Sequence, residues 1–200
     1  MSHEVMQDLT TDTRLPAHLL AAALTGPARV AVGVGALSRA AVVAVARHGA
    51  GVELTAEAED AVRASRKVVE ALADDPVPHY GVSTGFGALA NRHIPAQLRA
   101  ELQRSLVRSH AAGSGPEVER EVVRAMQLLR LSTLATGRTG VRLGTARQYA
   151  ALLTAGITPV VAEYGSLGCS GDLAPLAACA LALTGEGTAV SYTHLTLPTN

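Results

Sequence analysis

Residues 165–176, GSLGCSGDLAPL, place one serine between a cysteine and a glycine, with a carboxylate directly after them. A tight bend here brings the amide nitrogen of Gly171 against the carbonyl carbon of Cys169, because glycine has no Cβ to block the approach. Ring closure releases one water, and loss of a second water from the Ser170 side chain leaves an exocyclic methylidene. The segment can therefore make a strong electrophile from its own backbone.

The residues around this triad suit that chemistry. Cys169 contributes only its backbone, so a cysteine is compatible with ring formation. Asp172 is a natural N-cap for a helix that begins near Leu173, and the positive end of that helix favours electron density arriving at the ring. A second interpretation makes the Cys169 thiol a nucleophile activated by the helix N-terminus, but no local signature supplies its histidine partner.

A glycine-rich irregular stretch, HYGVSTGFGALANRHI, covers residues 79–94. Such loops can place a phenol over a substrate, which makes Tyr80 a candidate, although a tyrosine in this position is commonly a packing residue with a wet hydroxyl. The same stretch contains GVSTG, which matches the GxSxG pattern of serine hydrolases and offers Ser83 as a nucleophile. That elbow needs a strand before it, and DDPVPHY is not typical of one.

His110 lies in VRSHAAGSG, at the end of a predicted helix. Taken alone, it is a histidine whose cation suits the negative end of the helix dipole. Arg104 and Arg108 on the same helix are interpreted as part of a solvated face or of subunit contacts.

The composition limits the class of protein. The 200 residues are 48% hydrophobic but only 2% aromatic, so the core must consist of Ala, Val and Leu, which favours close-packed helices. The net charge is zero, and the sequence lacks the stripe of basic residues that is typical of a nucleic-acid binder. The two cysteines suggest neither a disulfide framework nor zinc, and no segment resembles a signal peptide or a membrane span. These features predict a cytoplasmic protein that acts on small molecules.

Hydrophobic spacing and capping residues predict a mainly α fold with short β elements near the N-terminus. In one helix Leu98, Leu102 and Leu106 are expected to face inward. Ser114 and Glu117 form a capping box that predicts a helix start. The predicted strands are 29–35 and 51–55, with 157–161 extended, and the predicted helices are 39–49, 56–73, 95–110, 114–137, 141–155 and 173–184.

Three segments, YGVSTGFG, LQRSLVRSHAAG and GSLGCSGDLAPL, resemble in this order the signatures of the aromatic amino acid ammonia-lyases. The resemblance covers about residues 27 to 190. The pair Ser109-His110 is similar to the pair found in members that act on histidine. The resemblance implies the N-terminal part of the lyase fold, in which short β elements precede the start of a long helical bundle.

The resemblance also implies the chemistry. Cys169, Ser170 and Gly171 would form 4-methylidene-imidazol-5-one (MIO) autocatalytically, with no metal or diffusible cofactor. Tyr80 would transfer the proton at the β-carbon of the substrate, and His110 with Ser109 would face its ring. The reaction would be the non-oxidative elimination of ammonia from L-histidine to give urocanate, the first step of histidine degradation, by a carbon–nitrogen lyase that is a homotetramer and has no nucleic-acid or membrane partner.

The sequence also departs from the family. Its members continue far beyond residue 200 with further active-site residues, and many that act on histidine have a histidine where this chain has Ala178. We expect residues 1–14 to be a flexible tail, 15–190 a truncated lyase domain, and 191–200, SYTHLTLPTN, a non-native tail of sequencing origin, with no function for His194. A genuine strand is the other interpretation of that tail.

Three other functions remain open from the sequence. A sister lyase or aminomutase acting on tyrosine or phenylalanine shares every MIO feature. A serine hydrolase would use Ser83. A non-catalytic fragment would lack MIO.

Overall fold

The computed structural model describes residues 29–169 and 171–191. The expectations for residues 1–14, Ser170, His194 and most of 191–200 therefore lie outside the described residues. The helices are α2 (Arg39–Ala46), α3 (Ala56–Asp74), α4 (Ala96–His110), α5 (Arg120–Ala135), α6 (Leu143–Thr154) and α7 (Leu173–Leu183), with a 3-10 turn η1 (Gly87–Leu89). The strands are β1 (Arg29–Val32), β2 (Gly51–Leu54), β3 (Ser114–Glu117), β4 (Ile157–Pro159), β5 (Ala162–Tyr164) and β6 (Ala189–Ser191). The expectation of a mainly helical fold is confirmed.

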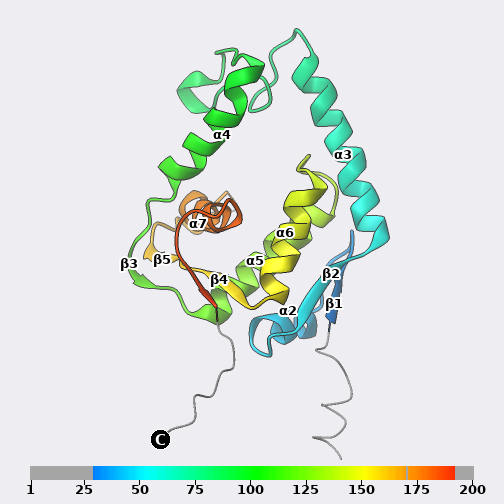
Figure 1. Ribbon diagram of the computed structural model, residues 1–200, viewed down its shortest axis with the longest axis vertical. Helices are drawn as coiled ribbons and strands as arrows, with labels where there is room; N and C mark the ends of the chain where they lie inside the picture. The colour runs from blue at the N-terminus through cyan, green and yellow to red at the C-terminus, as the bar shows by residue number, and fades with distance from the viewer. Residues whose placement is uncertain (1–28, 170, 192–200) are drawn as a thin grey trace, which may run out of the picture.

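The strands form three small pairs. β1 and β2 pair in parallel and are joined through α2, whereas β3 pairs antiparallel with β5 and β4 antiparallel with β6. Figure 1 shows α5 and α6 side by side in the middle of the molecule. The long helices α3 and α4 approach each other at the loop that connects them. The last described helix, α7, packs against α4.

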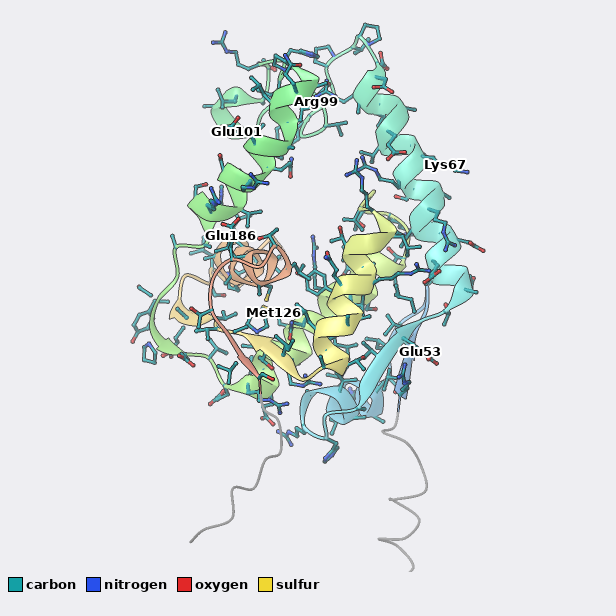
Figure 2. All side chains as sticks on the ribbon, in the orientation of Figure 1. Glu53, Lys67, Arg99, Glu101, Met126 and Glu186 are labelled. Carbon is teal, nitrogen blue, oxygen red and sulfur yellow. The ribbon has the colours of Figure 1, made fainter. Side chains whose placement is uncertain are left out.

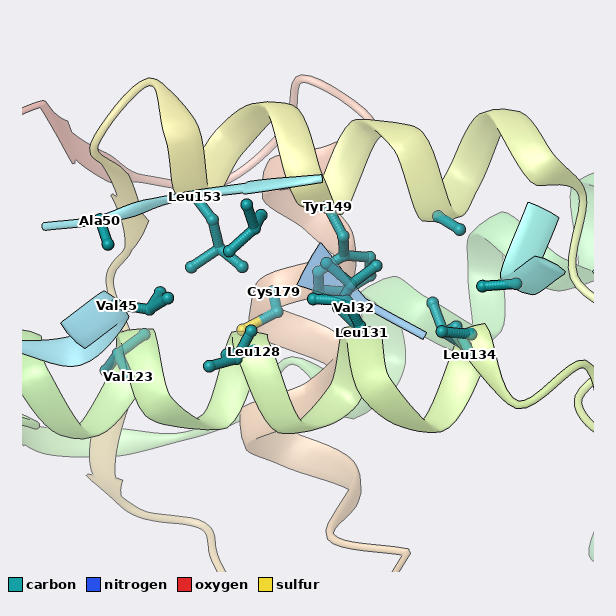
Figure 3. Close-up of a cluster of buried hydrophobic side chains, with 14 of the residues drawn as sticks. Val32, Val45, Ala50, Val123, Leu128, Leu131, Leu134, Tyr149, Leu153 and Cys179 are labelled. Carbon is teal, nitrogen blue, oxygen red and sulfur yellow. The ribbon is translucent and has the colours of Figure 1, made fainter. Parts of the chain in front are cut away.

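The core lies between α2, α5 and α6 and consists mostly of aliphatic side chains (Figure 3). Tyr149 is the aromatic member of this cluster, in agreement with the low aromatic content of the chain. Cys179 of α7 is also buried there. The aliphatic residues that line the cluster include Val32, Val45, Val123, Leu128, Leu131, Leu134 and Leu153.

A buried arginine crosses this core. The side chain of Arg124 on α5 is fully buried, and its guanidinium donates from Nε to the Val45 carbonyl at 3.0 Å and from Nη1 to the Leu153 carbonyl at 3.2 Å. Burial, with Arg120 nearby, lowers the pKa of Arg124. Both carbonyls lie in the last turn of a helix, α2 and α6. Among the described residues the Val45 carbonyl has no main-chain donor, whereas the Leu153 carbonyl also accepts from the Gly156 amide at 3.2 Å. One cation therefore satisfies the negative ends of two helices at once.

The capping box expected at Ser114 and Glu117 is wrong. Residues 114–117 form the exposed strand β3, and α5 begins only at Arg120, with Glu119 as an N-cap whose side chain makes no capping bond. Gly115 has φ of +87°, which is incompatible with a helical turn, and β3 pairs with β5 instead. A local capping signal was overridden by pairing with a strand about fifty residues away in sequence.

The inward face expected for α4 is only partly observed. None of its residues is fully buried, and Leu98, expected to face inward, is 48% exposed. Within residues 29–169 and 171–191, no helix has the length and the apolar character that crossing a membrane requires.

We expect Arg124→Met to destabilise the fold strongly. The change leaves the Val45 carbonyl without a donor, at a cost of about 1–3 kcal/mol, and removes one of the two donors to the Leu153 carbonyl. The free energy of unfolding, measured by urea denaturation at low protein concentration, should fall by roughly 2–5 kcal/mol. The matched control is Arg138→Met, which removes an exposed arginine and should change stability by less than about 0.5 kcal/mol. Equal stability of the two variants would contradict the role of Arg124.

Candidate active site

The triad lies on the loop that connects β5 to α7. Gly165 opens this loop with φ of +147°, and a Cβ built on it would lie 3.0 Å from the Cβ of Ala174 and 3.1 Å from the Cα of Gly113. A side chain at position 165 would therefore be disfavoured by this φ and would press on Ala174 and on the backbone that follows α4. At Gly165 the loop passes tightly between α7 and the segment after α4.

Asp172 occupies the expected N-cap position of α7, but its side chain does not cap the helix. Oδ1 accepts a hydrogen bond from the Leu167 amide at 2.9 Å, and Oδ2 accepts one from the Ser166 hydroxyl. The hydroxyl of Ser166, followed by the Leu167 amide, lowers the pKa of Asp172. The expected capping role is therefore wrong: the carboxylate turns back and closes the loop in which the triad lies. Nothing in the sequence pattern singles out Ser166 for this contact.

The described members of the triad are open to solvent. Cys169 is an exposed free thiol, Gly171 is exposed, and Ser170 lies outside the described residues. A Cβ built on Gly171 would meet no atom within 4 Å apart from its chain neighbours. Packing therefore does not account for the glycine at this position. By contrast, burial raises the pKa of the Cys179 thiol to about 12, which makes that cysteine an unsuitable nucleophile.

His110 is the last residue of α4, and its ring is held by local hydrogen bonds. Nδ1 lies 2.8 Å from the Leu106 carbonyl and 3.1 Å from the Ser109 hydroxyl, which itself donates to the same carbonyl at 2.9 Å. A carbonyl oxygen can only accept, so Nδ1 carries the proton. In the neutral ring, Nε2 is then left as an acceptor, a tautomer suited to binding an N–H group.

The end of α4 that carries His110 lies near the triad loop. Strand β3 follows shortly after and pairs with β5, with Ser114 opposite Tyr164. Arg108 forms an ion pair with Glu186 at 2.6 Å, which ties α4 to the segment after α7. A cavity of about 190 Å³ lies between these elements, and Ala178 contributes to its wall along with Ala111, Gly113, Val161, Ala174 and Leu181.

Tyr80 lies away from His110 and from the triad loop. It belongs to the loop between α3 and α4, at the opposite end of α4 from His110 (Figure 1). The 15 residues of α4 span about 22 Å. Tyr80 is 64% exposed, its hydroxyl accepts from the Gly87 amide at 3.4 Å, and its ring meets Phe86 edge-on. In the described part of the chain, no hydrogen bond or ring contact joins it to residues 165–169 or 171.

Ser83, offered by the GxSxG match, is fully buried. Its hydroxyl accepts from the His79 amide at 2.9 Å, and its own amide donates to the His79 carbonyl at 3.0 Å. No strand comes directly before it. A hydroxyl that is buried and engaged inside a turn cannot present itself to an ester or amide, so the structure gives the hydrolase interpretation no support.

Comparison with known proteins adds an independent finding. The sequence profile of the family described as aromatic amino acid lyase matches residues 37–199. A histidine ammonia-lyase of Streptomyces griseus is 66% identical over 160 residues, which make up 80% of this chain and 31% of that protein. A histidine ammonia-lyase of Streptococcus gordonii is 46% identical over 146 residues, 73% of this chain and 28% of that protein. The chain thus spans less than a third of the length of these relatives.

Solved structures agree with the sequence comparison. A tyrosine aminomutase from Streptomyces globisporus superimposes with a TM-score of 0.76 at 40% identity, covering 81% of this chain and 30% of that one. A histidine ammonia-lyase from Trypanosoma cruzi gives a TM-score of 0.73 at 34% identity, covering 82% of this chain and 31% of that one.

We expect the closure of the triad loop by Asp172 to depend on pH. Because the pKa of this carboxyl is lowered in the folded protein, its contribution is present above the ordinary carboxyl pKa and is lost as the pH falls through the lower, folded-state value. Protection of the Leu167 amide against hydrogen exchange, corrected for intrinsic rates, should therefore decline only below about pH 4.

The Asp172→Ala variant should lose this protection at every pH, because the acceptor of the Leu167 amide is removed. Glu163→Ala removes an exposed carboxylate from neighbouring β5 and should leave the protection intact. Unchanged protection in Asp172→Ala would show that the carboxylate does not close the loop.

Proposed function

The chain belongs to the aromatic amino acid lyase family, and on that premise we propose that the full-length protein is a histidine ammonia-lyase that converts L-histidine to urocanate and ammonia. The observation that carries the proposal is the 66% identity to the Streptomyces griseus enzyme over four-fifths of this chain.

Cys169, Ser170 and Gly171 form the MIO group in this proposal. The fit is supported by the exposed loop and by the open space around Gly171, where no packing contact demands a glycine and ring closure does. When formed, the group supplies an electrophile that makes the amino group of the substrate a better leaving group. The following helix α7, with its positive N-terminal end beside the loop, favours the electron density that gathers there. A hydrogen bond from Ser166 to Asp172 links the residues before and after the three.

His110 and Ser109 bind the substrate ring. With Nδ1 protonated and bonded to the Leu106 carbonyl, the neutral His110 ring offers Nε2 as an acceptor for the imidazole N–H of L-histidine. Ser109 helps to fix this tautomer from the adjacent position. This pair supports histidine over a substrate with a purely hydrocarbon ring.

Tyr80 takes the proton from the β-carbon of the substrate. It lies at the far end of α4 from the triad loop, so one chain does not bring the two together. We therefore propose that the enzyme acts as a cytoplasmic homotetramer in which Tyr80 of one subunit completes the site of another. The exposure of Tyr80 supports a role at such a contact.

A second candidate is an aminomutase or ammonia-lyase acting on tyrosine or phenylalanine. The observation that favours it is the TM-score of 0.76 to tyrosine aminomutase, against 0.73 for the Trypanosoma cruzi histidine enzyme. Both activities need the same MIO triad, so the ring-binding residues decide between them.

The test uses the full-length gene product, with its sequence first confirmed by resequencing across the codons for 191–200, which we propose to be non-native. We expect an intact mass lighter than the translated mass by two waters, and formation of urocanate from L-histidine but no product from tyrosine or phenylalanine. Ser170→Ala should be lighter than its own translated mass by at most one water and should lack turnover, because alanine has no hydroxyl to eliminate and cannot form the methylidene. Turnover of tyrosine in place of histidine would favour the second candidate.

The 200-residue chain alone should be inactive and should self-associate. Val122, Met126 and Leu129 of α5 line an open apolar groove of about 420 Å³, and Leu129 is 52% exposed. Exposed apolar surface of this kind promotes association. Light scattering should report oligomers or aggregates, reduced in Leu129→Lys, and no urocanate should form. Robust turnover by a monomeric 200-residue chain would refute the prediction.

A further inference from the structure

The loop that carries Tyr80, residues 75–94, is held at both of its ends by one side chain. Arg99, in the first turns of α4, donates from Nη1 to the Ala73 carbonyl at 2.7 Å and from Nε to the Ile94 carbonyl at 3.0 Å. Ala73 lies just before the loop and Ile94 is its last residue. Figure 2 places Arg99 where α4 meets the loop. The guanidinium thus bridges the point where the chain leaves α3 and the point where it enters α4.

The end of α3 needs this cation. The last turn of α3 contains no basic residue, and the helix terminates in Asp74 and Asp75, two acids at the negative end of the dipole. The Ala73 carbonyl belongs to the group that has no intrahelical donor. Arg99 supplies both the missing donor and the missing positive charge, and the planar fork of the guanidinium allows it to reach two carbonyls at once.

A series of hydrogen bonds connects Ile94, which Arg99 binds, to the residue before Tyr80. The Ile94 amide donates to the Ser83 carbonyl at 2.8 Å, and Ser83 is bonded through both its hydroxyl and its amide to His79, the residue directly before Tyr80. Ser83 and Thr84 are buried, so this part of the loop cannot shift without exposing polar groups. A displacement of Ile94 is therefore passed to the backbone of Tyr80.

We propose that Arg99 is a positioning residue for Tyr80. It holds the two ends of the loop together, and through Ile94 and Ser83 it fixes the place of the phenol. The inference rests on the proposed function in so far as Tyr80 takes a proton from the substrate.

The test is a double-mutant cycle in the full-length protein. Arg99→Met should lower kcat at least about tenfold while KM changes less than about threefold, because misplacement of a catalytic group affects the chemical step more than binding. In a Tyr80→Phe background, the same change should lower kcat less than about twofold, because Arg99 acts through the lost hydroxyl. Arg99→Lys, which can reach one carbonyl as a point charge, should give an intermediate kcat.

Arg92→Met is the matched control. It removes an exposed arginine from the same loop whose side chain makes no hydrogen bond or ion pair with the described residues, and it should leave kcat unchanged. An Arg99→Met loss of the same size with and without the Tyr80 hydroxyl would overturn the proposal, as would an unchanged kcat. If Arg99→Met does not accumulate as folded protein, the double-mutant cycle is made with Arg99→Lys instead. A loss of kcat of the same size with and without the Tyr80 hydroxyl would again overturn the proposal.

Amide exchange separates this inference from the proposed function. Exchange of residues 79–86 should be faster in Arg99→Met than in Arg92→Met, whatever reaction the protein catalyses. If the wild-type protein forms no urocanate but the loop loosens as expected, the proposed function fails and the loop-holding role of Arg99 stands. Equal exchange in the two variants would overturn that role.

Discussion

The buried guanidinium of Arg124 is the contact on which the arrangement of the core depends. It comes from α5 and donates to terminal carbonyls of α2 and α6, so these three helices share one cation. Burying a charge is costly, and the cost is offset only while both carbonyls stay in place. The aliphatic side chains around it have no directional contacts of their own to choose between helix registers.

The site depends on this core indirectly. With α5 and α6 fixed, β4 follows from the end of α6 and leads through β5 into the triad loop. The pairing of β3 with β5, strands of four and three residues, then brings the end of α4 beside the start of that loop. Short strands suffice because the helices behind them carry the packing.

The sequence predicted the helices well because their aliphatic residues recur at helical spacing and their ends carry Gly, Pro or Ser. It failed at Ser114 and Glu117, where a capping pattern competes with strand pairing that no local window contains. It also failed to assign a role to Arg124 and to Arg99. Both look like ordinary surface arginines in a helical pattern, and only the fold reveals the carbonyls of Val45, Leu153, Ala73 and Ile94. The candidate site residues came from motif resemblance, and the structure supplies the geometry of Tyr80, His110 and Asp172.

Arg124 and Arg99 share one feature: each binds main-chain carbonyls and no side chain. Every residue type carries a carbonyl, so positions 45, 73, 94 and 153 are free to drift in identity as far as these contacts are concerned. The arginines have no such freedom, because no other side chain offers the same fork of donors. As far as these contacts are concerned, we expect sequences that adopt this fold to keep the two arginines and to vary at the four residues whose carbonyls they bind.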